Sequence, residues 1–183
     1  MSFSPEPGTP LAAYYAQTQP RIGTVLSRRS LGTVDAVTIG RYAMTIGAVD
    51  PSHYDRGAAW SAGHANVVAP PNLLAGIVEW GVGTPESSLQ DDGTPVDGET
   101  PLGDGDLGLR VMGAGEEMEL VNAVVAGTEV VLETTLESVT PKQTRSGPCV
   151  FVTTKHTFMS VDGVVLNRNR RTVVLRNPLQ ESS

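Results

Sequence analysis

The sequence has few of the residues on which several classes of protein depend. Cys149 is the single cysteine, so no internal disulfide can form, and this composition favours a reducing cytoplasm. Three scattered histidines and one cysteine give no metal-ligand spacing, and we expect no metal site. No apolar run reaches the roughly 18 residues that a membrane-spanning helix needs. The start, MSFSPEPGTP, lacks the basic and apolar parts of a secretory signal.

The acidic charge of the chain is confined to one segment, residues 84–109. The formal net charge is −7, yet outside this segment 13 acidic residues balance 13 basic ones. The acids of the segment are Glu86, Asp91, Asp92, Asp97, Glu99, Asp104 and Asp106. A chain without a basic stripe is not expected to bind nucleic acid. The segment itself is expected to be a solvated loop, with a lid or partner-binding strap as the alternative.

The N-terminal part is weakly patterned until residue 35. Residues 1–20 are rich in proline and predict a loose arm, with a short helix around residues 10–17. Residues 22–34 predict a first strand. Asp35 then precedes a helical stretch over residues 36–46, for which Gly47 provides a stop.

The most helix-like segment covers residues 67–80. Pro70 and Pro71 suit a first helical turn, apolar residues recur at helical spacing from Leu73, and glycines at 81 and 83 end the pattern. We expect a long apolar central helix here.

The C-terminal half alternates as a sheet does. Strands are predicted over residues 117–122, 129–140, 150–160 and 164–176, with Asp162-Gly163 as a tight hairpin. A central helix followed by a meander of four such antiparallel strands predicts an α+β protein with one hot-dog domain, an antiparallel sheet wrapped around a helix. The domain would cover residues 21–177, with a tail at 178–183. Its edge strand favours dimers.

One stretch carries a recognisable motif. Residues 42–55 read YAMTIGAVDPSHYD, and this resembles the hydratase motif of MaoC-like proteins. Further points of resemblance are Ala59, Gly63, the VAPP of residues 68–71, the GEE of residues 115–117, Gly127-Thr128, Gly147, Gly163 and Arg176. Together they cover roughly residues 20–177.

The resemblance implies an activity on acyl thioesters. MaoC-like hydratases add water to, or remove it from, a 3-hydroxyacyl group carried by coenzyme A or acyl carrier protein, and they need no further cofactor. An Asp and a His, five residues apart, activate the water, because one group must take a proton while the other handles the hydroxyl. A backbone N–H at the start of the central helix polarises the thioester carbonyl.

This sequence departs from that pattern in two places. Ala48 stands where the catalytic Asp is expected, and a methyl group cannot accept a proton. Pro70-Pro71 stands where catalytic members commonly have His-Gly, and proline has no N–H to donate. The substrate-binding halves of double-hot-dog dehydratases show the same Pro-Pro pattern. The resemblance therefore implies an acyl-binding subunit whose partner performs the chemistry.

Asp50 and His53 leave a second possibility open. They are three residues apart in a loop, and they could form a shifted acid–base pair. The alternative is structural: Asp50 caps a turn before Pro51, and His53 packs at an interface.

The remaining candidates concern binding. The resemblance suggests contacts with the acyl thioester from Tyr42, Tyr54, Pro71, Asn72, Leu73, Arg168 and Arg170. The arginines, next to Arg171, would contact phosphates of coenzyme A or carrier protein, or they form a solvated strand face. His156 is expected to be a satisfied, half-buried side chain, and His64 a loop residue.

Three functions follow from these residues. The first is an acyl-binding subunit, paired with a second hot-dog subunit in a MaoC-like dehydratase or hydratase. The second is a stand-alone enzyme that uses Asp50 and His53 for dehydration, isomerisation or cyclisation of an acyl or polyketide substrate. The third is a dimer that binds an acyl ligand without catalysis.

Overall fold

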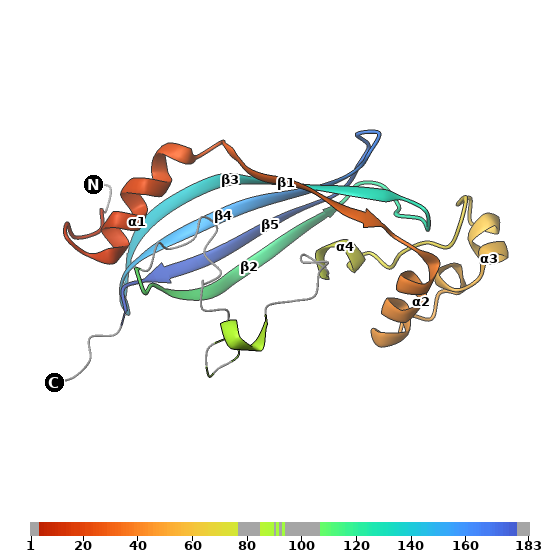
Figure 1. Cartoon of the computed structure of the whole chain (residues 1–183), viewed down its shortest axis with the longest axis horizontal. Helices are drawn as coiled ribbons and strands as arrows, with labels where there is room; N and C mark the ends of the chain where they lie inside the picture. Colours follow the sequence, from red (N-terminus) through yellow and green to blue (C-terminus); the bar gives the residue numbers. More distant parts are fainter. Residues whose placement is uncertain (1–3, 77–84, 90, 92, 94–106, 179–183) are drawn as a thin grey trace.

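A curved antiparallel sheet forms the body of the protein (Figure 1). The computed structural model describes residues 4–76, 85–89, 91, 93 and 107–178. Within these ranges the strands are β1 (Val25–Thr33), β2 (Arg110–Leu120), β3 (Glu129–Thr144), β4 (Gly147–Ser160) and β5 (Val165–Arg176). The helices are α1 (Pro10–Thr18), α2 (Ala36–Thr45), α3 (Arg56–Ser61) and α4 (Leu73–Gly76), with short 3₁₀ turns η1 (Gln19–Arg21), η2 (Pro51–His53) and η3 (Glu86–Ser88). The predicted α+β class is confirmed.

The strand order of the sheet is β1-β3-β4-β5-β2. The chain thus forms a meander of three strands, β3 to β5, and the predicted meander of four is wrong because β2 pairs with β5 rather than with β3. β2 also begins at Arg110, seven residues before the predicted start, and β3 continues to Thr144. A hairpin is present at Asp162-Gly163, with Gly163 at a φ of 86° and the Ser160 amide donating to the Val164 carbonyl. Its loop is longer than the two-residue turn predicted from the Asp-Gly pair, because residues 161–164 separate β4 from β5.

α1 packs on one end of the sheet. Thr9 caps it by accepting from the Ala12 amide, and Leu11 and Tyr14 are buried. The side chain of Asn177, beyond the last strand, accepts a hydrogen bond from the Leu11 amide at 2.9 Å. The predicted short helix is therefore present, but residues 10–18 are packed against the sheet rather than loose.

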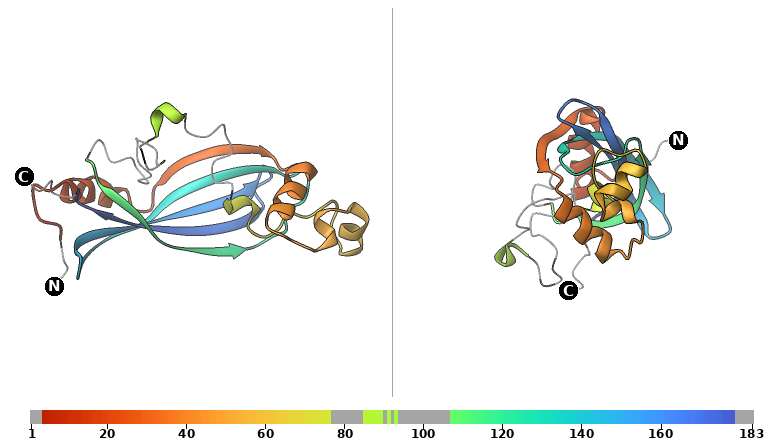
Figure 2. Two further views of the ribbon diagram at one scale, coloured as in Figure 1. Left: turned by 90° about the horizontal axis from the view of Figure 1, so that it is seen from below. Right: turned by 90° about the vertical axis from the view of Figure 1, so that its right-hand side faces the viewer.

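α2 and α3 lie beyond the opposite end of the sheet (Figures 1 and 2). Asp35 caps α2 as predicted, by accepting from two amides of the first turn. The helix ends where Gly47 adopts a φ of 68° and the Ala48 amide donates to the Ala43 carbonyl, a Schellman-type end. We call residues 36–66, which contain α2, η2 and α3, the lobe.

The central helix starts later than its sequence pattern predicts. Val68 forms an isolated bridge with Val125, and the first helical residue is Leu73. Two consecutive prolines explain the shift, because the residue before a proline is disfavoured in the helical conformation. The predicted continuation over residues 77–80 lies outside the described residues, as does most of the acidic segment.

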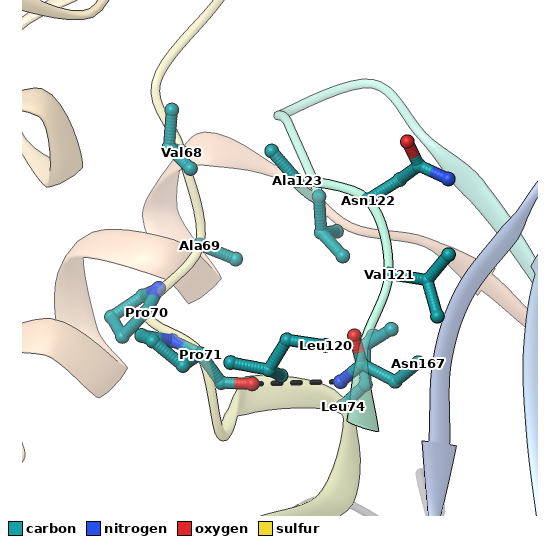
Figure 3. A pocket seen from close by; sticks show the side chains of 11 residues that line it. Val68, Ala69, Pro70, Pro71, Leu74, Leu120, Val121, Asn122, Ala123 and Asn167 are labelled. Carbon is teal, nitrogen blue, oxygen red and sulfur yellow. Dashed lines mark hydrogen bonds between the residues drawn. The ribbon is translucent and has the colours of Figure 1, made fainter. Parts of the chain in front are cut away.

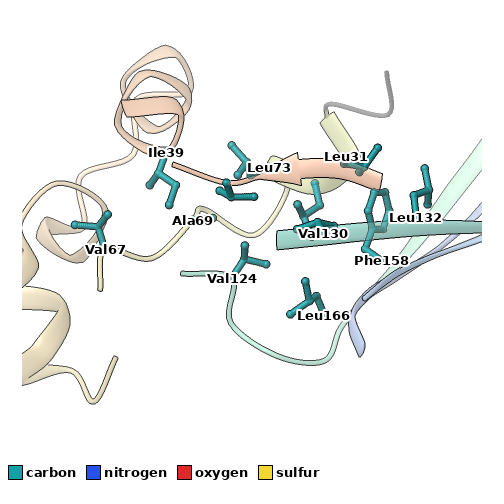
Figure 4. Close-up of a cluster of buried hydrophobic side chains, with 12 residues drawn as sticks. Leu31, Ile39, Val67, Ala69, Leu73, Val124, Val130, Leu132, Phe158 and Leu166 are labelled. Carbon is teal, nitrogen blue, oxygen red and sulfur yellow. The ribbon is translucent and has the colours of Figure 1, made fainter. Parts of the chain in front are cut away.

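Two apolar clusters fill the inner face of the sheet. The α4 cluster, to which the lobe contributes Ile39, comprises Leu31, Val34, Ile39, Val67, Ala69, Leu73, Leu74, Val124, Val130, Leu132, Phe158 and Leu166 (Figure 4). The α1 cluster comprises Leu11, Tyr14, Leu109, Leu136, Val139, Val150, Val152, Val173 and Leu175. None of the helices in the described ranges is long and apolar enough to span a membrane.

Candidate functional site

The carboxylate of Asp50 caps the short turn η2. Its Oδ1 accepts a hydrogen bond from the Ser52 amide at 2.9 Å. Hydrogen bonds from the Ser52 backbone and then from its hydroxyl lower the pKa of Asp50, and the nearby His53 adds to this effect. The group is fully exposed, so it is a strongly ionised carboxylate with a structural task.

The ring of His53 is held by the backbone of Val68. Its Nδ1 lies 2.7 Å from the Val68 carbonyl oxygen, and the Tyr54 ring meets it edge-on. A carbonyl can only accept, so Nδ1 carries the proton, and Nε2 of the neutral ring holds a lone pair that can accept one. The His53 amide donates to the Asp50 carbonyl at 3.2 Å, but among the described contacts no hydrogen bond joins their side chains. Their predicted catalytic role remains a prediction, whereas the capping role of Asp50 is observed.

Ala48 brings no proton acceptor to the position of the expected carboxylate. Its side chain is a methyl group, and its carbonyl accepts a hydrogen bond from the Tyr54 hydroxyl at 2.6 Å. The phenol of Tyr54, a predicted substrate contact, therefore holds the lobe together. Tyr42 is likewise engaged, since it packs against the α4 cluster.

A pocket of about 230 Å³ lies between the start of α4 and the connection from β2 to β3 (Figure 3). It is lined by Val68, Ala69, Pro70, Pro71, Leu74, Leu120, Val121, Asn122, Ala123, Val124 and Asn167. The Asn167 amide spans it weakly, 3.5 Å from the Pro71 carbonyl. Val68, whose carbonyl holds His53, belongs to the same wall. The pocket is thus mainly apolar, has one buried amide, and adjoins the motif.

The predicted contacts around the start of α4 have different surroundings. Pro71 lines the pocket, and Asn72 is exposed. Leu73 is buried in the α4 cluster, and its amide donates to the Pro70 carbonyl. That amide is therefore already used within the turn that precedes α4.

The predicted arginines are paired with carboxylates. Arg168 binds Glu119 at 2.9 Å, and Arg170 binds Glu137 at 2.9 Å, which raises the pKa of Arg170. Arg168 also follows Asn167 directly, and successive strand residues point to opposite faces of a sheet. These arginines thus lie on the face away from the pocket, which does not favour the predicted phosphate contacts.

Sequence reasoning missed two buried asparagines on β5. Asn167 and Asn169 are 2% and 1% exposed, and they alternate with Arg168 and Arg170 along the strand. This alternation of asparagine and arginine along β5 was the sequence signal that could have indicated their burial. Beside them, His156 is hydrogen-bonded to Thr134 and Thr154, as expected of a satisfied side chain. Burial, then the charge of Arg171, lowers the pKa of His156.

The comparisons agree with this fold and this motif. The family described as FAS1-like, dehydratase domain region, matches residues 21–168, which is most of the chain. The chain belongs to this dehydratase family. Its predicted hot-dog fold and MaoC-like resemblance are thereby confirmed. No curated protein matches the sequence. In the parts of the chain that the structure describes, no three metal-binding side chains are grouped.

Solved structures of three relatives illustrate the similarity. The ChsH1-ChsH2 complex from Mycobacterium tuberculosis has a chain with 22% identity and a TM-score of 0.69, with 94% of each chain covered. The MaoC-like dehydratase from Rhodospirillum rubrum has 25% identity and a TM-score of 0.59, covering 86% of this chain and 94% of the other. The HadBC (3R-hydroxyacyl-ACP dehydratase) complex from Mycobacterium tuberculosis has 14% identity and a TM-score of 0.57, covering 84% and 96%.

Proposed function

We propose that this member of the dehydratase family is the acyl-binding subunit of a hot-dog pair that hydrates an enoyl thioester or dehydrates a 3-hydroxyacyl thioester. The observation that carries the proposal is Ala48. A general base is missing where the motif needs one, while an apolar pocket persists beside it. A subunit that binds the acyl chain but lacks the base is what we expect if the partner subunit carries out the reaction.

The surface of the lobe supports the presence of a partner. Six large apolar side chains are exposed on it: Val37, Met44, Ile46, Val49, Tyr54 and Trp60. Val49 is 92% exposed and Met44 74%. A soluble monomer rarely exposes apolar residues so densely in one segment. The edge strands β1 and β2 offer further pairing sites, and two of the similar structures are of complexes.

The proposal is tested by filling the pocket. Ala123 is exposed at its rim, so Ala123→Phe should leave the fold intact while occupying the space. Ala62→Phe, also exposed but outside the pocket, is the matched control. Acyl-coenzyme A should raise the melting temperature of the wild-type and control proteins but not of Ala123→Phe. An equal rise in all three proteins would exclude this pocket as the acyl site.

A stand-alone enzyme is the second candidate, and the ring of His53 favours it. Because Nδ1 is tied to the Val68 carbonyl, Nε2 is the nitrogen that could take a proton. The exposed carboxylate of Asp50 would then be its partner across the turn. In that case His53→Ala abolishes turnover of an acyl thioester by the purified chain, and unchanged turnover removes this candidate.

A further inference from the structure

The inner face of the sheet becomes polar between its two apolar clusters. Thr134, His156 and Asn169 are register neighbours on β3, β4 and β5, and they form a polar row. The row on one side contains Leu132 and Phe158. The row on the other side contains Leu136, Thr154 and Arg171, and beyond it apolar residues return with the α1 cluster. A sheet face that packs on a core is normally apolar, so this polar row needs a reason.

His156 does not need a ligand. Thr154 lies 3.5 Å from the Arg171 carbonyl, which can only accept, so its hydroxyl donates there and accepts from the Nε2–H of His156. Nδ1 then accepts from the Thr134 hydroxyl at 3.1 Å. Both ring nitrogens are satisfied in the neutral ring.

Asn169 differs, because half of its amide has no partner. Its Nδ2 donates to Glu116 Oε1 at 2.8 Å, and since a carboxylate only accepts, this contact fixes the orientation of the amide. Its Oδ1 is then buried without a hydrogen bond among the residues that the structure describes. Buried polar atoms nearly always have a partner, and an exception calls for an explanation.

Asn169 is not one of the residues that line the pocket, but it follows a pocket residue along β5. Asn167 lines the pocket, and Asn169 is two residues further on the same face, about 7 Å away at the usual rise of a strand. On β2, Leu120 of the pocket lies opposite Asn167, and Met118 lies opposite Asn169. A chain that enters beside Asn167 and follows β5 therefore meets Asn169 next.

We propose that Asn169 Oδ1 accepts a hydrogen bond from a hydroxyl on the bound acyl chain, located further along the chain than the reacting C2–C3 bond. This inference rests on the proposed acyl-binding function, and it names the substrate class: an acyl thioester that carries an additional hydroxyl group. A keto group does not fit, because an amide oxygen has no proton to donate.

The test compares ligands that differ by one group. Acyl-coenzyme A thioesters of one chain length, each with a hydroxyl at a successive carbon beyond C3, are titrated into the wild-type protein by calorimetry. One regioisomer should bind about fivefold to tenfold more tightly than the unsubstituted chain, as one net hydrogen bond allows. The keto compound at the same carbon should show no such gain.

Two variants locate the effect. Asn169→Leu should remove the preference for the hydroxyl while it still binds the unsubstituted chain. Thr172→Val, which affects a threonine pair on the outer face of β5, should keep the preference. Equal binding of all regioisomers to the wild-type protein, equal binding of keto and hydroxyl compounds, or a preference that persists in Asn169→Leu overturns the inference. If no acyl thioester binds at all, the proposed function itself fails.

Discussion

At the scale of single residues, the polar side chains of the motif support their own loop. Asp50 caps η2, Tyr54 holds the Ala48 carbonyl, and His53 ties the lobe to Val68. The two interpretations that the sequence left open for Asp50 thus have unequal support, since its capping contact is observed and a catalytic one is not. A cap is recognisable from an Asp before Pro-Ser, whereas the partner of His53 is 15 residues away and could not be predicted.

Restoring the missing base should restore chemistry. The motif places an Asp at position 48 and a His five residues later, and His53 is already oriented. Ala48→Asp should therefore hydrate a trans-2-enoyl-coenzyme A at least about 100-fold above background, the usual contribution of a general base. Ala48→Asn, which has the same shape without a basic carboxylate, should stay at background. Equal rates for the two variants would show that the absence of the carboxylate is not what limits the reaction.

His156 should make the stability of the fold depend on pH. Its pKa in the folded protein is below the ordinary value of 6.5, so the unfolded chain binds a proton more readily. Above pH 6.5 its contribution is constant. As the pH falls from 6.5 through the lowered pKa, stability is lost.

This dependence can be isolated by substitution. Denaturant unfolding of His156→Gln should show a smaller loss of stability between pH 7.5 and about 5.5 than the wild-type protein. His64→Gln is the control, because His64 lies in a loop outside the Thr134–Thr154 network. Parallel pH profiles for the wild-type protein and His156→Gln would mean that the buried ring does not govern this range.

At the scale of elements, the features that depend on neighbouring residues could be predicted from the sequence, and those that depend on distant contacts could not. Asp35 and Gly47 indicated where α2 begins and ends, because a cap and a glycine with a left-handed backbone conformation act within a few residues. The start of β2 was missed because Arg110–Gly115 contains two glycines and a bulge and does not alternate. The start of α4 shifted because Pro70 and Pro71 disfavour the helical conformation in the residue before each of them, and Val68 pairs instead with Val125, a contact across 57 residues.

The lobe should determine association with a partner. Met44→Glu together with Val49→Glu places charges on two of its most exposed apolar side chains. The variant should keep the wild-type melting temperature but lose association, as seen by native mass alone or with a co-expressed hot-dog subunit. Val164→Glu, equally apolar and half exposed in the β4–β5 hairpin, is the control. Association that survives in the lobe variant would place the interface elsewhere.

At the scale of the whole molecule, the sheet order was the main feature that the sequence could not supply. Alternation identifies strands, but it does not say which strands are neighbours, so β2 was placed beside β3 rather than at the edge next to β5. The two buried asparagines were missed for the same reason, because their burial depends on which face of the sheet is covered. The family itself was recognisable from the ordered motifs, and residues 21–168 confirm it.

The most direct test of the account is an enoyl-hydration assay on the purified chain, with trans-2-enoyl-coenzyme A of a short and a long acyl length. We expect no turnover above background by the chain alone, while the same thioesters raise its melting temperature. Robust turnover that disappears in His53→Ala would contradict it. The chemistry would then have been rebuilt around Asp50 and His53, and the chain would be an enzyme in its own right.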